Sequence, residues 1–128
     1  MQKMKLIIPT FNRSAKLART LSCYSMGNYN INNMVVIDGS DDDHSALNAE
    51  NCRRLGFTYL KYDSKLDLVE RLHSYLINWC DHHELVCIGT EEDVFCNSYI
   101  DHAEKFLTEN LEYSAYIGRY ITLGKPLL

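Results

Sequence analysis

Residues 34–43 read MVVIDGSDDD: an apolar run at residues 34–37 ends in a turn that contains Asp38 and Gly39 and continues into more acids. An apolar run without alternation is typical of a strand buried on both faces of a sheet. In open α/β folds the ligand site lies at the carboxyl ends of such strands. Residues 85–95, LVCIGTEEDVF, repeat the arrangement. Two acidic strand ends predict a site for a divalent cation and a phosphorylated ligand.

Strands and helices are predicted in alternation on either side of residues 34–43. The strands are expected at residues 5–8, 34–37, 57–62, 85–89 and 113–122. Helices are expected to begin at Ser14, near Ser45, near Val69 and at Asn97 or Ser98, with Gly56 ending the second. This alternation predicts right-handed βαβ crossovers. The predicted fold is α/β and Rossmann-like: a three-layer, open, mainly parallel sheet of order 3-2-1-4, with helices on both faces.

Two details of this fold bear on the site. The inner face of the third helix is predicted from apolar residues spaced three, four and three apart, namely Val69, Leu72, Leu76 and Trp79. The order 3-2-1-4 places the fourth strand beside the first. Residues 10–12, Asp38 and residues 91–93 are then expected around one crevice.

Length and composition narrow the class of protein. The 128 residues suit one domain, residues 1–128. The net charge of -4 and the lack of a Lys/Arg cluster predict no nucleic-acid partner. The apolar runs are far shorter than the roughly 20 residues that span a bilayer, so no transmembrane segment is expected. The first residues lack the apolar stretch of a signal peptide. The five cysteines include no CxxC pair, which favours reduced thiols and a cytoplasmic location.

Three motifs, LIIPTFNR at residues 6–13, VVIDGSDD at residues 35–42 and EED at residues 91–93, together resemble the family 2 nucleotide-sugar glycosyltransferases. Residues 6–13, LIIPTFNR, are similar to the family's opening strand, which ends in a Pro-Thr-aromatic-Asn-Arg turn. Residues 35–42, VVIDGSDD, resemble its second-strand Val-Val-Asp-Asp-Gly-Ser signature. Residues 91–93, EED, stand where the family carries an Asp-x-Asp metal motif after its fourth strand, and residues 118–120 are compatible with its next strand. The resemblance covers residues 5–95 and implies a GT-A fold, of which this chain would be the N-terminal, nucleotide-binding portion.

The resemblance also implies roles for single residues. A Mn²⁺ or Mg²⁺ ion would bridge the protein to the diphosphate of a nucleotide sugar. Glu91 and Asp93 are the candidate metal ligands, Asp93 the better one, and Glu91 would face the ribose or the water molecules on the metal. Asp38 would hydrogen-bond the base. The remaining nucleotide-binding candidates are Pro9, Thr10, Phe11, Asn12 and Arg71, the last reaching the base or the diphosphate.

The chain departs from the family pattern in three ways. Ile37 replaces the first of the paired aspartates, and Glu91 replaces an aspartate. The family's acceptor-binding portion normally lies beyond the length of this chain, so it is expected to be absent. A transferase that inverts its sugar needs a base near the acceptor hydroxyl. The catalytic base therefore stays unknown, since Asp101 and Glu104 are expected on a solvated helix face.

Three functions are compatible with these observations. The leading one is a glycosyltransferase-like domain that binds a nucleotide sugar with a divalent cation, for transfer to an unknown acceptor. The alternative is a non-catalytic module that binds a sugar nucleotide, which Ile37 and the short chain favour. A receiver-like signalling domain would want an acidic pair after the first strand, where residues 9–12 carry no acid. The simpler readings are a solvated helix start for residues 41–43, a plain acidic loop for residues 91–93, and a polar loop rather than a zinc site for residues 80–87.

Overall fold

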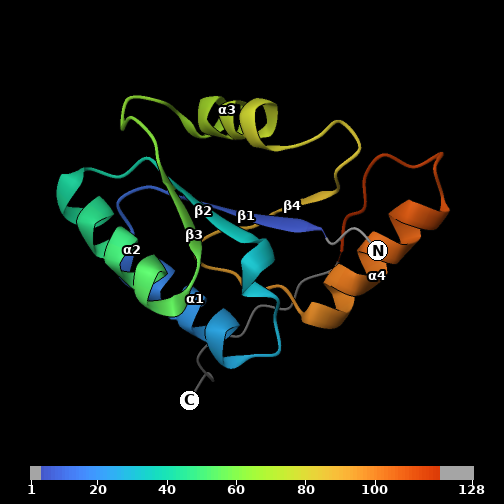
Figure 1. Cartoon of the computed structure of the whole chain (residues 1–128), viewed down its shortest axis with the longest axis horizontal. Coiled ribbons are helices and arrows are strands. Elements are labelled where there is room, and N and C mark those ends of the chain that lie inside the picture. The colour runs from blue at the N-terminus through green and yellow to red at the C-terminus, as the bar shows by residue number, and fades with distance from the viewer. Residues whose placement is uncertain (1–3, 119–128) are drawn as a thin grey trace, which may run out of the picture.

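Strand and helix alternate four times over residues 4–118 (Figure 1). A computed structural model describes residues 4–118. Its elements are β1 (Lys5–Thr10), α1 (Ser14–Met26), a 3-10 turn (Ile31–Asn33), β2 (Met34–Asp38), α2 (Asp42–Leu55), β3 (Thr58–Lys61), α3 (Leu68–Trp79), β4 (Val86–Ile88) and α4 (Asn97–Glu109).

The four strands form one parallel sheet in the order β3-β2-β1-β4, which confirms the predicted order. Ile7 of β1 lies between Val35 of β2 and Ile88 of β4. The carboxyl ends of β1, β2 and β4 therefore lie side by side at one edge of the sheet. The fold is α/β and Rossmann-like.

Helices cover both faces of the sheet, as predicted (Figure 1). On one face, Leu6, Ile8 and Val36 pack against α1 and α2. On the other face, Ile7 and its neighbours on β2 pack against Tyr75 of α3. Because neighbouring residues of a strand point to opposite faces, the unbroken apolar runs of β1 and β2 supply both cores at once.

The prediction of which face of α3 packs on the sheet is wrong, because the helix is rotated about its axis relative to the predicted orientation. The buried residues of the helix are Arg71 and Tyr75, whereas Val69 and Trp79 are 72% and 57% exposed. Leu72, together with Leu76, packs only partly against the sheet core. The physical reason is Arg71, whose guanidinium hydrogen-bonds main-chain carbonyls at the ends of β1 and β2. A prediction from the spacing of apolar residues treats arginine as exposed to solvent. It therefore assigns the wrong face of α3 to the sheet.

The ends of the elements differ modestly from those predicted. Helix α2 begins at Asp42, earlier than expected, so the acids at its start lie in the first turn, where the helix dipole favours them. It ends at Gly56, as predicted, in the left-handed conformation with φ +87°. Ser14 begins α1 but does not cap it, because its hydroxyl is hydrogen-bonded to His44. Helix α4 begins at Asn97, one of the two expected starts.

Helix α4 reaches the start of β1 through a buried acid. Glu104 is 7% exposed, and its Oε2 accepts a hydrogen bond of 2.7 Å from the main-chain N–H of Met4. The expected solvated position of Glu104 is therefore wrong, while Asp101 is exposed as expected. Residues 113–118 are not in a strand, and the rest of the strand predicted at residues 113–122 lies outside the described residues. Over residues 4–118, the helices are all too short or too polar to cross a membrane.

The orientation of α3 can be tested with two aromatic residues on the same helix. Tyr75→Ala should lower the free energy of unfolding by about 3–5 kcal/mol, because it empties a site that is 3% exposed. Trp79→Ala should lower it by no more than about 1 kcal/mol, because that ring is largely in solvent. Urea denaturation measures both values. A larger loss for Trp79→Ala than for Tyr75→Ala would restore the helix orientation predicted from periodicity.

Candidate functional site

The turn after β1 is tied to the turn after β2 at the carboxyl edge of the sheet. Asn12 adopts a left-handed conformation with φ +53°. Its main-chain N–H donates to the hydroxyl of Ser40 at 2.8 Å. Its side-chain oxygen accepts from the N–H of Asp41 at 2.8 Å, while its amide nitrogen donates to the Asp41 carboxylate at 2.9 Å. Asn12 thus joins the two strand ends that carry the first two motifs.

Asp38, the last residue of β2, points into the protein. Its carboxylate is 0% exposed. One oxygen accepts from the N–H of Ser40 at 2.7 Å, and the other accepts from Asn48 at 2.9 Å and from the hydroxyl of Tyr59 at 2.8 Å. Burial, together with the hydrogen bond to Asp38, raises the pKa of Tyr59 well above its usual value. A hydrogen bond from Asp38 to a nucleotide base would require one of these donors to leave.

Arg71 joins the ends of β1 and β2 from the opposite face. Its side chain is 4% exposed, and Nη1 donates to the carbonyls of Thr10 at 2.7 Å and Ile37 at 3.3 Å. Burial lowers the pKa of the guanidinium, an effect opposed by the charges of Asp38 and Glu91. Within residues 4–118, its Nε has no hydrogen-bond partner.

Gly39 lies directly over this guanidinium. A Cβ added to Gly39 would lie 2.8 Å from Nε of Arg71 and 2.9 Å from its Cζ. A side chain at position 39 would therefore displace Arg71. The glycine of the second motif is needed here because the arginine passes close beneath the turn.

Residues 90–93 form a compact acidic turn after β4. The hydroxyl of Thr90 accepts hydrogen bonds from the N–H groups of Glu92 at 3.2 Å and Asp93 at 3.1 Å, and donates to the Asp93 carboxylate at 3.0 Å. Glu91 is 14% exposed at its side chain, whereas Glu92 is 43% exposed. The turn thus fixes Asp93 locally and leaves Glu92 in contact with solvent.

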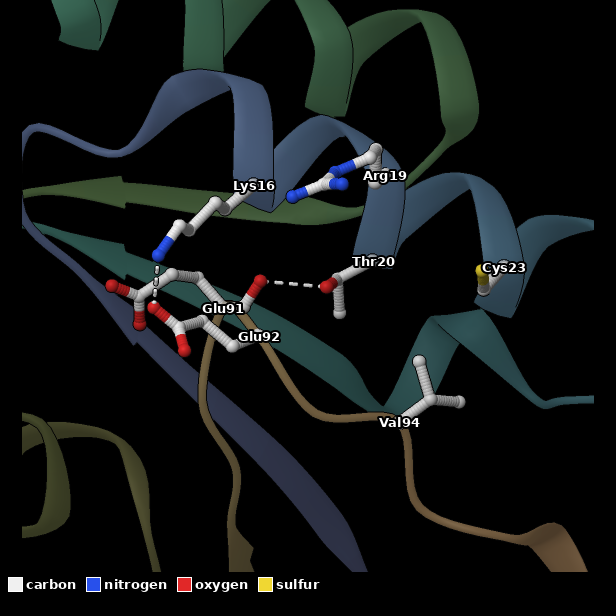
Figure 2. Close-up of a pocket in the computed structure, with 7 residues that line it drawn as sticks. All are labelled: Lys16, Arg19, Thr20, Cys23, Glu91, Glu92 and Val94. Atoms are coloured by element: carbon white, nitrogen blue, oxygen red, sulfur yellow. Dashed lines mark hydrogen bonds and ion pairs between the residues drawn. The ribbon is translucent and has the colours of Figure 1, made fainter. Parts of the chain in front are cut away.

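Two basic residues at the start of α1 pair with this turn. Arg13 contacts Glu91, with Nε 3.4 Å from Oε1, and also contacts Glu92 through Nη1. Lys16 lies 2.6 Å from the same Glu92 oxygen, as Figure 2 shows. Lys16, and then Arg13, lower the pKa of the Glu92 carboxyl. The end of β1 and the turn after β4 therefore meet, as the predicted crevice required.

Helix α1 also holds the main chain of the residues that follow β4. The hydroxyl of Thr20 donates to the carbonyl of Glu91 at 2.6 Å. Further along, the N–H of Phe95 donates to the hydroxyl of Tyr24 at 3.0 Å, and its carbonyl accepts from Tyr29 at 2.6 Å. These bonds fix the path of residues 91–95 along the helix.

A hollow of about 360 Å³ lies between α1 and this segment (Figure 2). Figure 2 shows Lys16 and Glu92 at one end of it and Cys23 and Val94 at the other. It is lined by Lys16, Arg19, Thr20, Cys23, Glu91, Glu92 and Val94. Glu91 is the only predicted site residue among them. The hollow therefore lies beside the predicted crevice rather than within it.

The other predicted nucleotide-binding residues lie at the carboxyl edge of the sheet and differ in their exposure to solvent. Pro9 is buried within β1, and Phe11 is 44% exposed in the turn that follows. Thr10 is buried, and its hydroxyl has no hydrogen-bond partner in the described part of the chain. The sequence reasoning missed the pairing roles of Arg13 and Lys16. Their position in the sequence could have indicated these roles. Cations at a helix N-terminus interact unfavourably with the helix dipole, which suggests that another interaction compensates for them.

The acidic turn carries carboxylate oxygens, which are the ligands that a hard divalent cation prefers. Among residues 4–118, no group of three or more His, Cys, Asp or Glu side chains is arranged to hold a metal ion. A Mg²⁺ or Mn²⁺ ion that keeps water molecules and phosphate oxygens needs only one or two carboxylates. Glu91 and Asp93 offer such oxygens on a single turn, and their residue types fit that ion.

Comparison with known proteins adds no family assignment. No protein-family model matches the chain, and no curated protein matches it closely enough to count as a relative. The resemblance to the glycosyltransferases therefore rests on the three sequence motifs alone.

The inward position of Asp38 can be tested by removing its carboxylate. Asp38→Ala should lower the free energy of unfolding by about 3 kcal/mol or more, because it leaves several buried donors unpaired. Asp101→Ala removes an exposed carboxylate and should change stability by about 0.5 kcal/mol or less. Thermal and urea unfolding measure both variants. Equal stabilities of the two variants would show that Asp38 is not held by Ser40, Asn48 and Tyr59.

Proposed function

We propose that this chain is a glycosyltransferase-like domain of GT-A type, which binds a nucleotide-diphosphate sugar together with Mn²⁺ or Mg²⁺ for glycosyl transfer to an acceptor. The observation that carries the proposal is the meeting of three motif-bearing strand ends at one edge. Asn12 joins the first two ends, and Arg13 joins the first to the acidic turn. Each motif is weak alone, but all three follow strand ends at the edge where open α/β folds bind their ligands.

The charges at this edge suit a diphosphate. Arg71 is buried beneath the turn after β2, and Lys61 of β3 donates to the carbonyl of Ser40 in the same turn. Arg13 lies at the start of α1. Guanidinium groups form short, charge-assisted hydrogen bonds with phosphate oxygens. A bound divalent cation would add electrostatic stabilisation of the departing nucleoside diphosphate. Glu91 and Asp93 are the residues that would hold it.

Asp38 takes a different role in this proposal from the one that the resemblance implies. Its carboxylate fixes Ser40 and, through α2 and β3, the position of the whole turn. It shapes the wall of the nucleotide pocket rather than contacting the base. The general base for the acceptor is not assigned to a residue.

A second candidate function is a module that binds a sugar nucleotide without transferring the sugar. The end of β2 favours it, because Ile37 is wholly buried in an apolar cluster and Asp38 is committed to internal donors. Neither residue 37 nor residue 38 therefore offers the ligand a free carboxylate. Release of sugar from a bound nucleotide sugar, followed over hours, distinguishes an enzyme from a binding module.

Metal-dependent binding provides the test of the proposal. UDP, GDP, CDP and dTDP are each added with and without Mn²⁺, and a nucleotide that binds the folded protein raises its melting temperature. Asp93→Ala should weaken Mn²⁺-dependent binding by about tenfold or more. Its stability should fall by only about 1 kcal/mol, because the carboxylate is exposed and, among residues 4–118, is hydrogen-bonded to Thr90 alone.

Asp101→Ala serves as the matched control, since it removes an exposed acid from α4. It should bind nucleotide as the parent does. Undiminished binding by Asp93→Ala in Mn²⁺ would remove the metal role of this residue. If none of the four nucleotides stabilises the parent protein, nucleotide-sugar binding is the wrong function.

A further inference from the structure

Helix α1 begins with charges of the unfavourable sign. Arg13 is its N-cap residue and Lys16 lies in its first turn, where no acidic residue is present. The positive end of the helix dipole disfavours cations at this position. Such a local conflict is expected where a residue serves a purpose other than helix stability.

The carboxylates opposite these cations are the ones that the proposed function assigns to a metal ion or places beside it. Arg13 contacts both Glu91 and Glu92, and Lys16 contacts Glu92 (Figure 2 draws the second pair). Arg13 and Lys16 are 52% and 46% exposed at their side chains. Ion pairs that water reaches hold weakly and exchange partners readily.

The main chain around these pairs is fixed on both sides. Asn12 is bonded to Ser40 and Asp41, which sets the place of Arg13. Thr20 holds the carbonyl of Glu91, which sets the place of the acidic turn. A change of partners by the charged side chains therefore requires only side-chain rotation, with no movement of the main chain.

We propose that Arg13 and Lys16 form a salt-bridge latch with Glu91 and Glu92, which closes the acidic turn when no ligand is bound and opens onto the diphosphate of the nucleotide. This inference rests on the proposed function. In the closed state the two cations balance the charges of Glu91 and Glu92. In the open state Glu91 is released toward the divalent cation, and the cationic side chains contact phosphate oxygens. A guanidinium can bind phosphate through two parallel hydrogen bonds, which makes Arg13 the main contact.

The latch predicts effects of opposite sign on two ligands. Loss of the Arg13 charge removes a competitor for Glu91, so a divalent cation alone should bind more tightly. The same loss removes a phosphate contact, so a nucleoside diphosphate should bind more weakly. The effect on the cation should shrink as salt concentration rises, because salt screens exposed charges.

Arg13→Gln and Lys16→Gln test the latch, with Arg19→Gln as the matched control. Arg19 lies on the same helix and lines the same hollow, but has no carboxylate partner within the described residues. Binding of Mn²⁺ alone is followed by the electron paramagnetic resonance signal of the free ion. Binding of UDP, GDP, CDP and dTDP is measured by calorimetry at saturating Mn²⁺.

Arg13→Gln should bind Mn²⁺ alone about two- to fivefold more tightly. It should bind the nucleoside diphosphate that the parent prefers about tenfold or more weakly. Lys16→Gln should change both affinities in the same directions as Arg13→Gln, but by smaller factors. It also provides the test if Arg13→Gln does not fold well. Arg19→Gln should match the parent for both ligands.

The outcomes separate the latch from the proposed function. If the parent binds Mn²⁺ and a nucleotide but Arg13→Gln and Lys16→Gln behave like Arg19→Gln, the latch is wrong and the proposed function stands. Changes of the same sign for both ligands also overturn the latch. If the parent binds none of UDP, GDP, CDP and dTDP in Mn²⁺, the latch falls together with the nucleotide site on which it rests.

Discussion

The carboxylate of Asp38 is the interaction on which the carboxyl edge depends. A fully buried charge is costly unless hydrogen bonds surround it. Here the bonds come from three separate parts of the chain: Ser40 in the turn, Asn48 of α2 and Tyr59 of β3. One side chain thereby positions a turn, a helix and a strand relative to β2. Since Ser40 in turn receives the main-chain N–H of Asn12, the order that Asp38 imposes extends to the end of β1.

Arg71 plays the complementary part on the other face of the sheet. The guanidinium donates from α3 to the carbonyl of Thr10, the last residue of β1, and to that of Ile37, the residue before the last of β2. The strand ends are thus fixed from both faces, by an anion on the side of α2 and a cation on the side of α3. The side chains that remain adjustable belong to the acidic turn and to the start of α1. Strand ends that are held in place give a ligand site the rigid support that it needs.

The sequence was sufficient to predict the sheet order and the meeting of the motifs, because apolar runs and βαβ handedness determine both. It did not reveal the direction of Asp38, although the alternation of a strand contains the answer. Asp38 lies two residues after Val36 and therefore points to the same face, that of α1 and α2. To predict the environment of Asp38 from this alternation, one must also know which helices cover each face of the sheet. The angle of α3 was missed for another reason: Arg71 is polar by type but buried by its partners, and no periodicity of apolar residues can show that. The pairs of Arg13 and Lys16 with residues 91–92 join segments more than 70 positions apart in the sequence, so only the fold could reveal them.

The replacement at Ile37 and the environment of Arg71 belong together. Ile37 packs on the α3 face of the sheet, the same face from which Arg71 reaches the strand ends. An acid at position 37 would stand near this guanidinium and neutralise it, whereas isoleucine supplies only its main-chain carbonyl. The charges of Asp38 and Glu91 act on Arg71 without a direct ion pair, and its Nε has no partner within residues 4–118. A buried cation that is only partly compensated raises the affinity of its surroundings for an anion. Within the proposed function, isoleucine at residue 37 therefore favours a phosphate group over a base contact at this strand end.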